Sequence, residues 1–389
     1  MIPIARPSLG EEEAAAAREA ILSGWVTQGP QVAAFEDEFA AFVGAPHACA
    51  VSSCTTALHL ALLAVGVGPG DEVTTVSHSF IATANAARYC GARPVFVDID
   101  PRTYNMDPAL LEAAITPKTR AIMPVHQIGL PCDMPAILAV ARRHGLPVVE
   151  DAACAIGSEL RIGSAWERIG RPHGTVACFS FHPRKVLTTG DGGMLTTHDP
   201  ELDARFRLLR QHGMSVSDLE RHTTDRVVFE EYPIVGFNYR LTDIQAAVGR
   251  VQLRRLPEML ARRRELAARY TRALAEIPGL APPFVPPYAR PNYQSYTVRV
   301  TTPYPLTRDA LMQALLDQGI STRRGIMNAH QEPAYRDLPS PGSAGYPALP
   351  HSEAARDTTL LLPLFHHLQD AEIEEVIEVM RQIAAKNEP

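Results

Sequence analysis

Between about residue 48 and residue 200, the chain alternates short strand-like runs with helical patterns. The strand-like runs are HACAVS, DEVTTVS, RPVFVDI, RAIMPVH, LPVVEDAA, TVACFSF and GGMLTTH. Helical stretches such as TTALHLALLAV, IATANAARYCG and DMPAILAVARRHG lie between several of them. Because parallel strands need a crossover connection, this alternation predicts an α/β fold with βαβ units and a mostly parallel sheet covered by helices.

The last two strand-like runs are connected differently from the others. Only the short, turn-rich link HPRKVLTTGDG separates them. A link of this length favours antiparallel pairing, so we expect a mixed sheet. Gly190, Gly192 and Gly193 supply the conformational freedom that a tight reversal needs, and this reversal would present Lys185 towards the inside of the protein.

The rest of the chain predicts a smaller α+β unit. A helical segment at about 242–275 precedes the stretch APPFVPPYARP, whose prolines exclude regular structure and favour a rigid connector. Beyond it come the strand-like YQSYTVRVT and the helical TRDALMQALLDQG. The closing helix, DAEIEEVIEVMRQIAAK, repeats apolar residues on one face: Ile373, Val376, Ile377, Met380 and Ile383. With 389 residues, the chain is long enough for two domains, which we place at 1–255 and 256–389.

Charge and hydrophobicity limit the possible partners. The formal net charge of −6 argues against a general binder of nucleic acid or anionic membranes. Arginines cluster at 254–255 and 262–264, but apolar residues recur among them at helical spacing, which predicts a solvated helix face. The start of the chain has no basic-then-apolar signal pattern, and TALHLALLAVGVG is too short to span a bilayer. These features predict a cytoplasmic protein.

The six cysteines form no CxxC pair, and most lie in or beside apolar segments. Their spacing therefore favours reduced core thiols over a disulfide framework or a zinc site. We accordingly expect no metal centre.

Polar residues follow several predicted strands at their carboxyl ends, where open α/β sheets bind ligands. These residues are His78, Phe80, His126, Glu150, Asp151, Ser180, His182 and Lys185. The stretch SSCTT opens a helix, where hydroxyl groups and free backbone N–H groups can bind a phosphate. Each feature alone also has a structural interpretation, as an N-cap or as a buried acid of the fold.

Together these groups are the ones that pyridoxal phosphate (PLP) requires of its protein. A lysine amine can form a Schiff base with the cofactor, and a carboxylate can keep its pyridine nitrogen protonated. An aromatic side chain can cover the ring, and a helix N-terminus can anchor the phosphate. An exposed lysine amine, with a pKa of about 10.4, would be protonated at neutral pH and therefore unreactive. A Schiff base with the cofactor removes this obstacle to reaction.

The sequence resembles the DegT/DnrJ/EryC1/StrS aminotransferases, which act mainly on nucleotide-linked keto sugars. The matching stretches are GWVTQGPQVAAFEDEFAAFVG, VSSCTTALHLAL, VSHSFIATANAA, VVEDAACAIGSE, CFSFHPRKVLTTGDGGM, GFNYRLTDIQAAVG and STRRGIMNAH, which span nearly the whole chain. The resemblance implies the PLP-dependent transferase fold type I, like that of aspartate aminotransferase. It further implies a homodimer with shared active sites and an amino acid donor, for which we expect L-glutamate.

The resemblance also assigns roles to single residues. Lys185 matches the Schiff-base lysine, Asp151 the partner of the pyridine nitrogen, and Phe80 the aromatic residue stacked on the cofactor ring. The phosphate ligands match Cys54 through its backbone, Thr55, Ser180 and, from the neighbouring subunit, Asn238. One departure is Cys154, which stands where the family usually has glutamine or histidine and is a weaker hydrogen-bond donor to the cofactor's phenolic oxygen.

Five further residues are candidates to line the substrate cleft: His126, His182, Arg323, Arg324 and His330. Arginine suits both a nucleotide diphosphate and a glutamate carboxylate because its guanidinium pairs with them in a bidentate manner. For each of the five, a purely structural role remains open at this point. Two other functions also remain open: a PLP- or PMP-dependent sugar dehydratase, whose family members carry histidine in place of the lysine, and a non-catalytic regulatory or binding protein.

Overall fold

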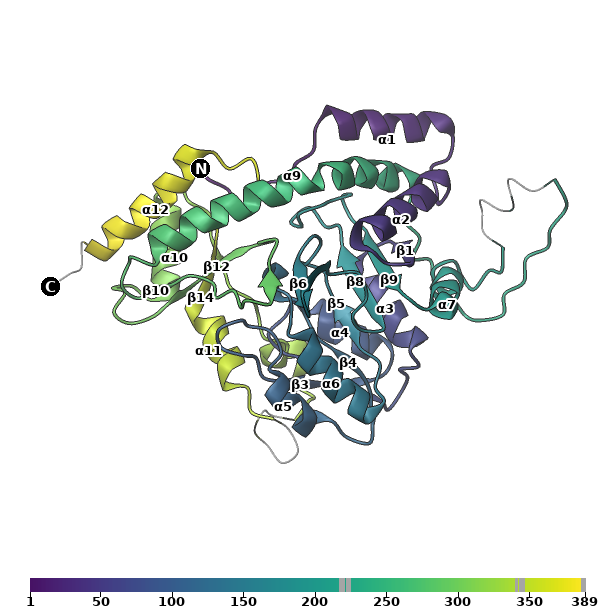
Figure 1. Ribbon diagram of the computed structural model, residues 1–389, viewed down its shortest axis with the longest axis horizontal. Helices are drawn as coiled ribbons and strands as arrows, with labels where there is room; N and C mark the ends of the chain where they lie inside the picture. Colours follow the sequence, from purple (N-terminus) through teal and green to yellow (C-terminus); the bar gives the residue numbers. More distant parts are fainter. Residues whose placement is uncertain (217–220, 222–224, 340–341, 343–346, 386–389) are drawn as a thin grey trace.

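A computed structural model describes residues 1–216, 221, 225–339, 342 and 347–385. Its centre is a sheet with helices on both faces, and a smaller part lies at one end of the long helix α9 (Asp243–Leu274) (Figure 1). The described chain confirms the predicted α/β class. No helix in the described ranges is both long and apolar enough to cross a membrane.

The central sheet joins two sets of hydrogen-bonded strands. One set has the order β1-β9-β8-β5 and the other the order β3-β2-β4. Parallel bridges from Ile122 to Val148 and from Val125 to Asp151 connect β4 to β5. The strands are β1 (His47–Val51), β2 (Glu72–Val76), β3 (Arg93–Val97), β4 (Thr119–Met123), β5 (Val149–Asp151), β8 (Val176–Ser180) and β9 (Gly193–Thr197).

Strand β9 runs antiparallel to both of its neighbours, β8 and β1, whereas the other pairs in the sheet are parallel. The prediction of a mixed sheet with antiparallel pairing after the short link is therefore confirmed. The link itself contains Gly190, whose positive φ of 87° is the backbone region that favours glycine.

Side chains of most central strands alternate between two apolar clusters. In β8, Ala177 and Phe179 belong to one cluster, while Val176 and Cys178 belong to the other. The first cluster packs against α2 (Pro30–Val43), α6 (Met134–His144) and the first half of α9. The second packs against α3 (Cys54–Ala64), α4 (Ala82–Tyr89) and α7 (Pro200–Arg210). Both faces are thus buried, which explains why these strands read as nearly continuous apolar runs.

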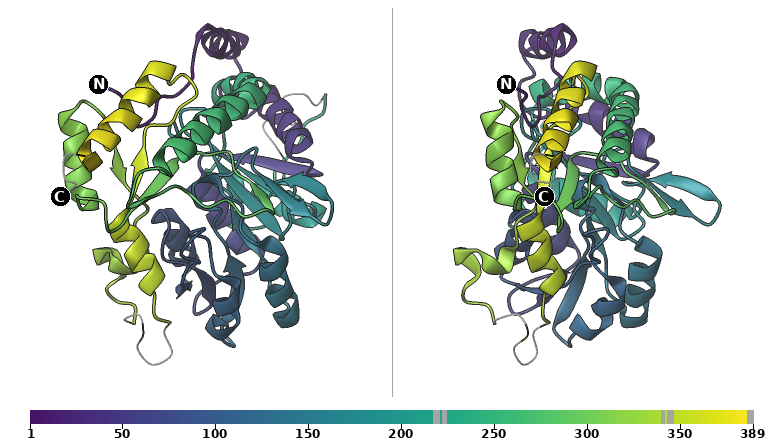
Figure 2. Two further views of the ribbon diagram at one scale, coloured as in Figure 1. Left: turned by 60° about the vertical axis from the view of Figure 1, so that its left-hand side comes forward. Right: turned by 90° about the vertical axis from the view of Figure 1, so that its left-hand side faces the viewer.

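A separate apolar cluster forms the core of the smaller part. It lies around an antiparallel sheet in the order β10-β12-β14-β13, with Leu266, Tyr270 and Leu274 from the second half of α9. The elements are β10 (Leu280–Ala281), β12 (Tyr296–Val300), β13 (Arg323–Arg324), β14 (Thr359–Leu362), α10 (Arg308–Asp317), α11 (Pro350–Thr358) and α12 (Asp370–Ala385). Figure 2 shows α12 and α9 running side by side.

The predicted apolar face of the closing helix is confirmed, because four of its residues are buried in this cluster and the fifth packs against it. The boundary at residues 255 and 256 stays a prediction, since α9 contributes side chains to both cores. Two shorter helices, α1 (Glu11–Ser23) and α5 (Pro108–Leu111), lie on the outside of the larger part.

A small third sheet was not predicted. It pairs β6 (Glu159–Ile162) with β7 (Ala165–Arg168) and with β11 (Ala289–Arg290), which lies inside the expected proline-rich connector. The expectation that this stretch lacks regular structure is therefore wrong at these two residues. Proline is absent from positions 289 and 290, so their N–H groups remain free to pair, and Arg290 stacks 3.8 Å from the Trp166 ring centre.

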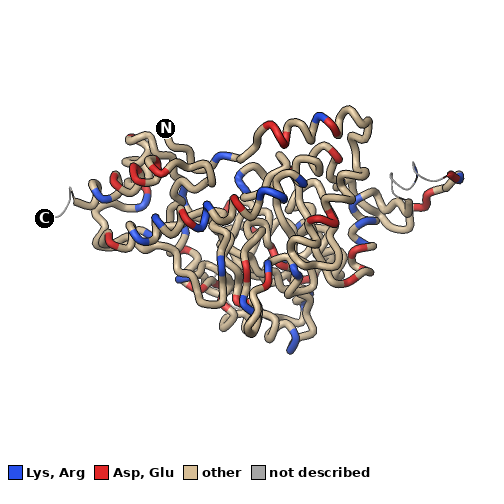
Figure 3. The backbone as a smooth tube through the Cα atoms, turned by 45° about the horizontal axis from the view of Figure 1, so that its top comes forward, with Lys and Arg blue, Asp and Glu red and all other residues tan. Residues whose placement is uncertain are grey.

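Acidic and basic residues are interspersed along the described backbone (Figure 3). The predicted solvated arginine face of α9 is only partly correct. Arg254 is exposed, but Arg263 is 6% exposed and donates hydrogen bonds to the carbonyl oxygens of Tyr293, Gln294 and Leu364 at 3.0, 2.7 and 3.1 Å. Burial lowers the pKa of Arg263 to about 10. The Arg263 side chain thus connects α9 to two loops of the smaller part by hydrogen bonds. Its position in a run of arginines did not indicate that it would be buried.

We expect Arg263→Met to lower the free energy of unfolding by about 3 kcal/mol, because it leaves buried carbonyl oxygens without donors. Arg254→Met, at an exposed position of the same helix, serves as the matched control and should change the free energy by less than about 0.5 kcal/mol. Urea titration of the cofactor-free protein measures both. Equal effects of the two substitutions would contradict the structural role of Arg263.

Candidate active site

Helix α3 begins at the edge of the sheet with an N-terminal capping box. The Ser53 hydroxyl accepts a hydrogen bond from the Thr56 N–H at 3.2 Å, and the Thr56 hydroxyl accepts one from the Ser53 N–H at 3.1 Å. The sequence SCTT thus both starts and caps the helix. The N–H groups of Cys54 and Thr55 belong to the first turn, where a helix offers no acceptor of its own and attracts anions.

Strand β9 passes very close to this helix start. A Cβ atom on Gly193 would lie 2.5 Å from the Ser53 carbonyl and 2.7 Å from the Cys54 nitrogen, so only glycine fits. Gly193 pairs with Ser180, the last residue of β8. The predicted phosphate ligands Cys54, Thr55 and Ser180 therefore lie around one point at the edge of the sheet.

Asp151, at the carboxyl end of β5, is 4% exposed. Its carboxylate accepts hydrogen bonds from the Thr83 hydroxyl at 2.7 Å and from the Ala153 N–H at 3.1 Å. Burial raises the pKa of Asp151, although these two donors and the charge of Lys185 oppose the rise. The sequence did not lead us to Thr83, although it lies only three residues after the candidate residue Phe80.

Lys185 lies in the link between β8 and β9 and is partly buried. Its backbone N–H donates to the His182 carbonyl at 2.8 Å, and its amine donates to the Cys154 sulfur at 3.0 Å. Burial acts to lower the pKa of Lys185, but Cys154 and, more weakly, Cys54 and Asp151 outweigh this effect and raise it. The amine is therefore held protonated beside the sulfur.

Phe80 lies between β2 and α4 and leaves its ring 63% exposed. The same segment carries Thr83, which bonds to Asp151, so Phe80 stands near the buried carboxyl. An exposed aromatic ring at the edge of such a site is suited to stack on a flat ligand.

Asn238 lies between α7 and α9, five residues before α9 begins. It forms a bridge with Gln211, and its neighbour Tyr239 accepts a hydrogen bond from the Ser52 N–H at 2.8 Å. Asn238 is thus anchored next to the start of α3 within its own chain. Its predicted role in a neighbouring subunit's site stays a prediction.

Some predicted substrate residues lie near Lys185. His182 is exposed, and its ring nitrogen Nδ1 accepts a hydrogen bond from the Arg184 N–H at 3.2 Å. Burial and, second to it, the charge of Arg323 lower the pKa of Arg184. Arg184 was missed by the sequence analysis, although it directly precedes Lys185.

Two predicted substrate residues form hydrogen bonds within the fold. His126 is completely buried, with its ring nitrogens bonded to the Glu150 carboxylate and to the Cys132 N–H, each at 3.0 Å. His330 bonds to the Ser77 hydroxyl at 2.6 Å and to Glu353 at 3.2 Å. Hydrogen bonds inside the protein occupy both nitrogens of each ring, and the predicted role of these histidines towards a substrate stays a prediction.

Arg324, the fifth candidate, is exposed on β13 and lies 4.0 Å from Glu332. In the described ranges, no group of three or more His, Cys, Asp or Glu side chains is placed to hold a metal ion. All six cysteines are free, and five of them are buried, as the prediction of core thiols requires.

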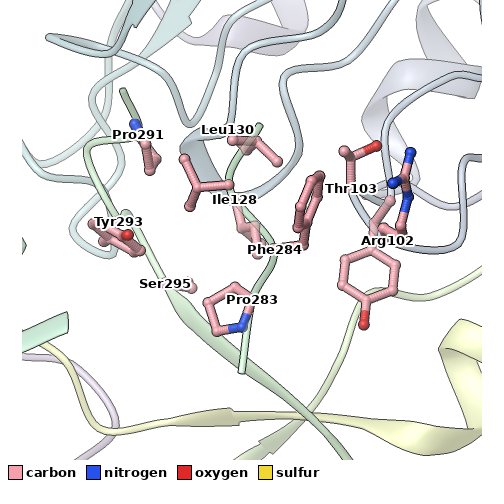
Figure 4. Close-up of a pocket in the computed structure, with 11 residues that line it drawn as sticks. Arg102, Thr103, Ile128, Leu130, Pro283, Phe284, Pro291, Tyr293 and Ser295 are labelled. Atoms are coloured by element: carbon pink, nitrogen blue, oxygen red, sulfur yellow. The ribbon is translucent and has the colours of Figure 1, made fainter. Parts of the chain in front are cut away.

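A small pocket, with a cavity volume of about 20 Å³, is lined by a different set of residues (Figure 4). Its lining is mostly apolar and includes Ile128, Leu130, Phe284 and Tyr293, with the Arg102 guanidinium 4.9 Å from the Phe284 ring centre. None of the predicted site residues lines it.

Comparison with known proteins agrees with this geometry. The model of the DegT/DnrJ/EryC1/StrS aminotransferase family matches residues 7–381. The spore coat polysaccharide biosynthesis protein SpsC of Bacillus subtilis is 43% identical over 384 residues, which cover 98% of this chain and 97% of SpsC.

Two solved structures show the same likeness in three dimensions. Spr1654 of Streptococcus pneumoniae, solved in its PMP and PLP forms, is 28% identical, and its PMP form has a TM-score of 0.90 over 99% of this chain and 100% of its own. DesI, solved in the presence of its TDP-sugar product, is 31% identical, with a TM-score of 0.87 over 99% of this chain and 93% of its own.

The fold and the site define a PLP-dependent aminotransferase of the kind that acts on sugars. The chain belongs to the DegT/DnrJ/EryC1/StrS aminotransferase family.

The residues present fit PLP. The site offers an amine on Lys185, a buried carboxyl on Asp151, an exposed ring on Phe80 and a helix N-terminus at α3. The close approach of Gly193 keeps this helix start free of side-chain atoms from β9. These four features match the aldehyde, the pyridine nitrogen, the ring and the phosphate of the cofactor.

We expect Thr83→Val to weaken PLP retention by about 2 kcal/mol, or roughly thirtyfold in affinity, because it removes a donor to a buried carboxylate. The loss of this donor should also raise the pKa of Asp151 further, so the fall in retention at low pH should begin at a higher pH. Equilibrium dialysis across a pH series measures both effects.

The matched control is Thr75→Val. Thr75 is also buried, and its hydroxyl donates at 2.7 Å, but to the Met123 carbonyl instead of Asp151. This variant should retain PLP with the unaltered pH profile. A Thr83→Val profile that coincides with the control would show that Asp151 does not depend on Thr83.

Proposed function

We propose that this enzyme moves the amino group of L-glutamate to a keto group of a nucleotide-linked sugar. The observation that carries the proposal is the meeting of the Lys185 amine, the buried Asp151 carboxyl and the start of α3 at one edge of the sheet. The likeness to DesI, whose structure was solved with a TDP-sugar product, supports a nucleotide-linked substrate.

When bound, PLP takes up the donor's amino group at its aldehyde carbon and stabilises the electron pair released at the substrate carbon. Around it, the Asp151 carboxylate would accept a hydrogen bond from the protonated pyridine nitrogen, and Phe80 would cover the ring. The N–H groups of Cys54 and Thr55, with the Ser180 hydroxyl, would bind the phosphate.

Lys185 has two tasks in this proposal. Its amine holds the cofactor, and after release by the donor it moves a proton at its Nζ atom to and from the substrate carbon. The contact with Cys154 keeps the amine in one position within this part of the site.

The substrate's negative charges would be bound by arginine. Arg184 directly precedes Lys185, the charge of Arg323 acts on Arg184, and His182 is exposed in the same link. Paired guanidinium groups suit a diphosphate or the carboxylate of glutamate. Arg324 lies on the same strand and is exposed, so it completes the basic side of the proposed cleft.

Two other functions are less consistent with these residues. A sugar dehydratase of this family would carry histidine at position 185, where this chain has lysine. A regulator without catalysis would have no need for a lysine amine and a buried carboxyl on one site edge.

The test is a half-reaction in the absence of sugar. L-Glutamate should convert the bound PLP to its amine form, and a nucleotide-linked keto sugar should convert it back with formation of an amino sugar, read by mass. Lys185→Ala should lose turnover by several orders of magnitude, keep its fold by circular dichroism, and no longer retain the cofactor covalently after borohydride reduction. Activity confined to simple keto acids would refute the sugar assignment, and borohydride trapping in Lys185→Ala would refute the assignment of the lysine.

The exposed segment before Asn238 supports a homodimer with shared sites. Val227, Phe229 and Val235 in this segment are 84%, 85% and 89% exposed, which is unusual for large apolar side chains. In our proposal a second copy of the chain covers them and receives Asn238 into its phosphate site.

Mixing Lys185→Ala with Asn238→Ala subunits tests this arrangement. If Asn238 acts across the interface, each hybrid dimer has one intact site, and activity should recover to roughly a quarter of the wild-type value. If Asn238 acts within its own subunit, no site in the hybrid is intact and activity stays lost. A fully active monomer in light scattering would contradict the dimer itself.

A further inference from the structure

The contact between Lys185 and Cys154 has chemical consequences beyond transamination. The amine nitrogen lies 3.0 Å from the thiol sulfur, which is hydrogen-bonding distance. Cys154 is also the one cysteine of the six that is not buried. The Lys185 amine and an accessible thiol thus face each other in the active site.

The backbone around Cys154 is fixed. The side-chain amide of Asn292, which is completely buried, donates hydrogen bonds at 2.8 Å to the carbonyl oxygens of Cys154 and Ile156. With its backbone held in this way, the position of the Cys154 thiol depends on little more than one side-chain torsion.

The other thiols near this site are placed differently. Cys54 is 7% exposed, and its thiol points to the Cys178 carbonyl oxygen at 3.6 Å. Cys178 is completely buried in the sheet. An oxidant that enters the cleft therefore reaches Cys154 before either of them, and the group in contact with the oxidised sulfur is the Lys185 amine.

The geometry points to Cys154 as an oxidation site whose oxidised sulfur captures Lys185 in a covalent sulfur–nitrogen bond. A peroxide converts the thiol to sulfenic acid and is itself reduced to water. The Lys185 ammonium group first loses a proton to solvent, and its nitrogen then attacks the sulfur. The S–O bond breaks, and the second oxygen leaves as water with one hydrogen from the amine. The net change is the loss of one hydrogen from the thiol and one from the amine.

The bond is reversible by thiols. A reducing thiol attacks the sulfur and releases the lysine amine with a proton, which leaves a mixed disulfide on Cys154. A second thiol then restores the Cys154 thiol and forms the disulfide of the reductant. Capture of Lys185 would block the cofactor's attachment point, and this consequence alone rests on the proposed function of Lys185.

The experiment treats the full-length protein with hydrogen peroxide, with and without PLP, then blocks free thiols and digests with trypsin. We expect the cofactor-free protein to lose two hydrogen atoms in mass, to resist trypsin after Lys185, and to yield linked peptides that contain Cys154 and Lys185. Dithiothreitol should reverse all three changes, and bound PLP should protect the protein because it occupies the lysine.

Cys154→Ser and Lys185→Arg should both abolish the link. Cys90→Ser removes a buried thiol that donates to the distant His59 carbonyl and should leave the link unchanged. Cys54→Ser distinguishes the proposed link from a disulfide between Cys54 and Cys154, which would cause the same change in mass. The sulfur–nitrogen link should still form in this variant, whereas the disulfide cannot.

Sulfinic or sulfonic acid on Cys154 with a free Lys185 would overturn the proposal, and so would a Cys54–Cys154 disulfide. Failure of the proposed function has a different signature. In that case the link forms and is mapped to the two residues, but PLP gives no protection and Lys185→Ala still retains the cofactor.

Discussion

The close packing of β9 against the start of α3 is the constraint on which the site depends. Gly193 leaves no room for a side chain against the Ser53 carbonyl, so the first residue of β9 is fixed at the helix start. Because β9 returns antiparallel beside β8, the link between them must lie at the carboxyl edge of the sheet. Lys185 is carried by this link, and the helix start that can bind a phosphate lies next to it.

The sequence predicted the central sheet well because its strands are buried on both faces. Apolar runs of this kind can be identified without knowledge of the partner strands. The small sheet of β6, β7 and β11 was missed because its strands are short and carry charged residues such as Glu159 and Arg161. Arg263 was misplaced for a related reason: its burial depends on carbonyl groups of Tyr293 and Leu364, which lie far away in sequence.

Within the site, the residues that the sequence placed together are those at strand ends and helix starts. Asp151 and Lys185 could be predicted because Asp151 ends a recognisable strand and Lys185 lies in the short link after another, whereas Cys154 came from the family resemblance. His126 follows a strand as well, yet it is buried, and only the position of Glu150 on the neighbouring strand shows this. Thr83 was missed because its importance comes from a single hydrogen bond across the sheet edge.

The two ionisable groups at the centre of the site are both biased towards their protonated forms. Burial raises the pKa of Asp151, and the neighbours Cys154, Cys54 and Asp151 raise that of Lys185. A cation next to Asp151 reverses the first bias, because an opposite charge lowers the pKa of a carboxyl group. In the proposed role of Asp151, a protonated pyridine nitrogen would be such a cation, and binding of the cofactor and ionisation of Asp151 would favour each other. The cost of burying the Asp151 carboxylate would thus be offset only when the site is filled, which would link the affinity for the cofactor to the charge state that the reaction requires.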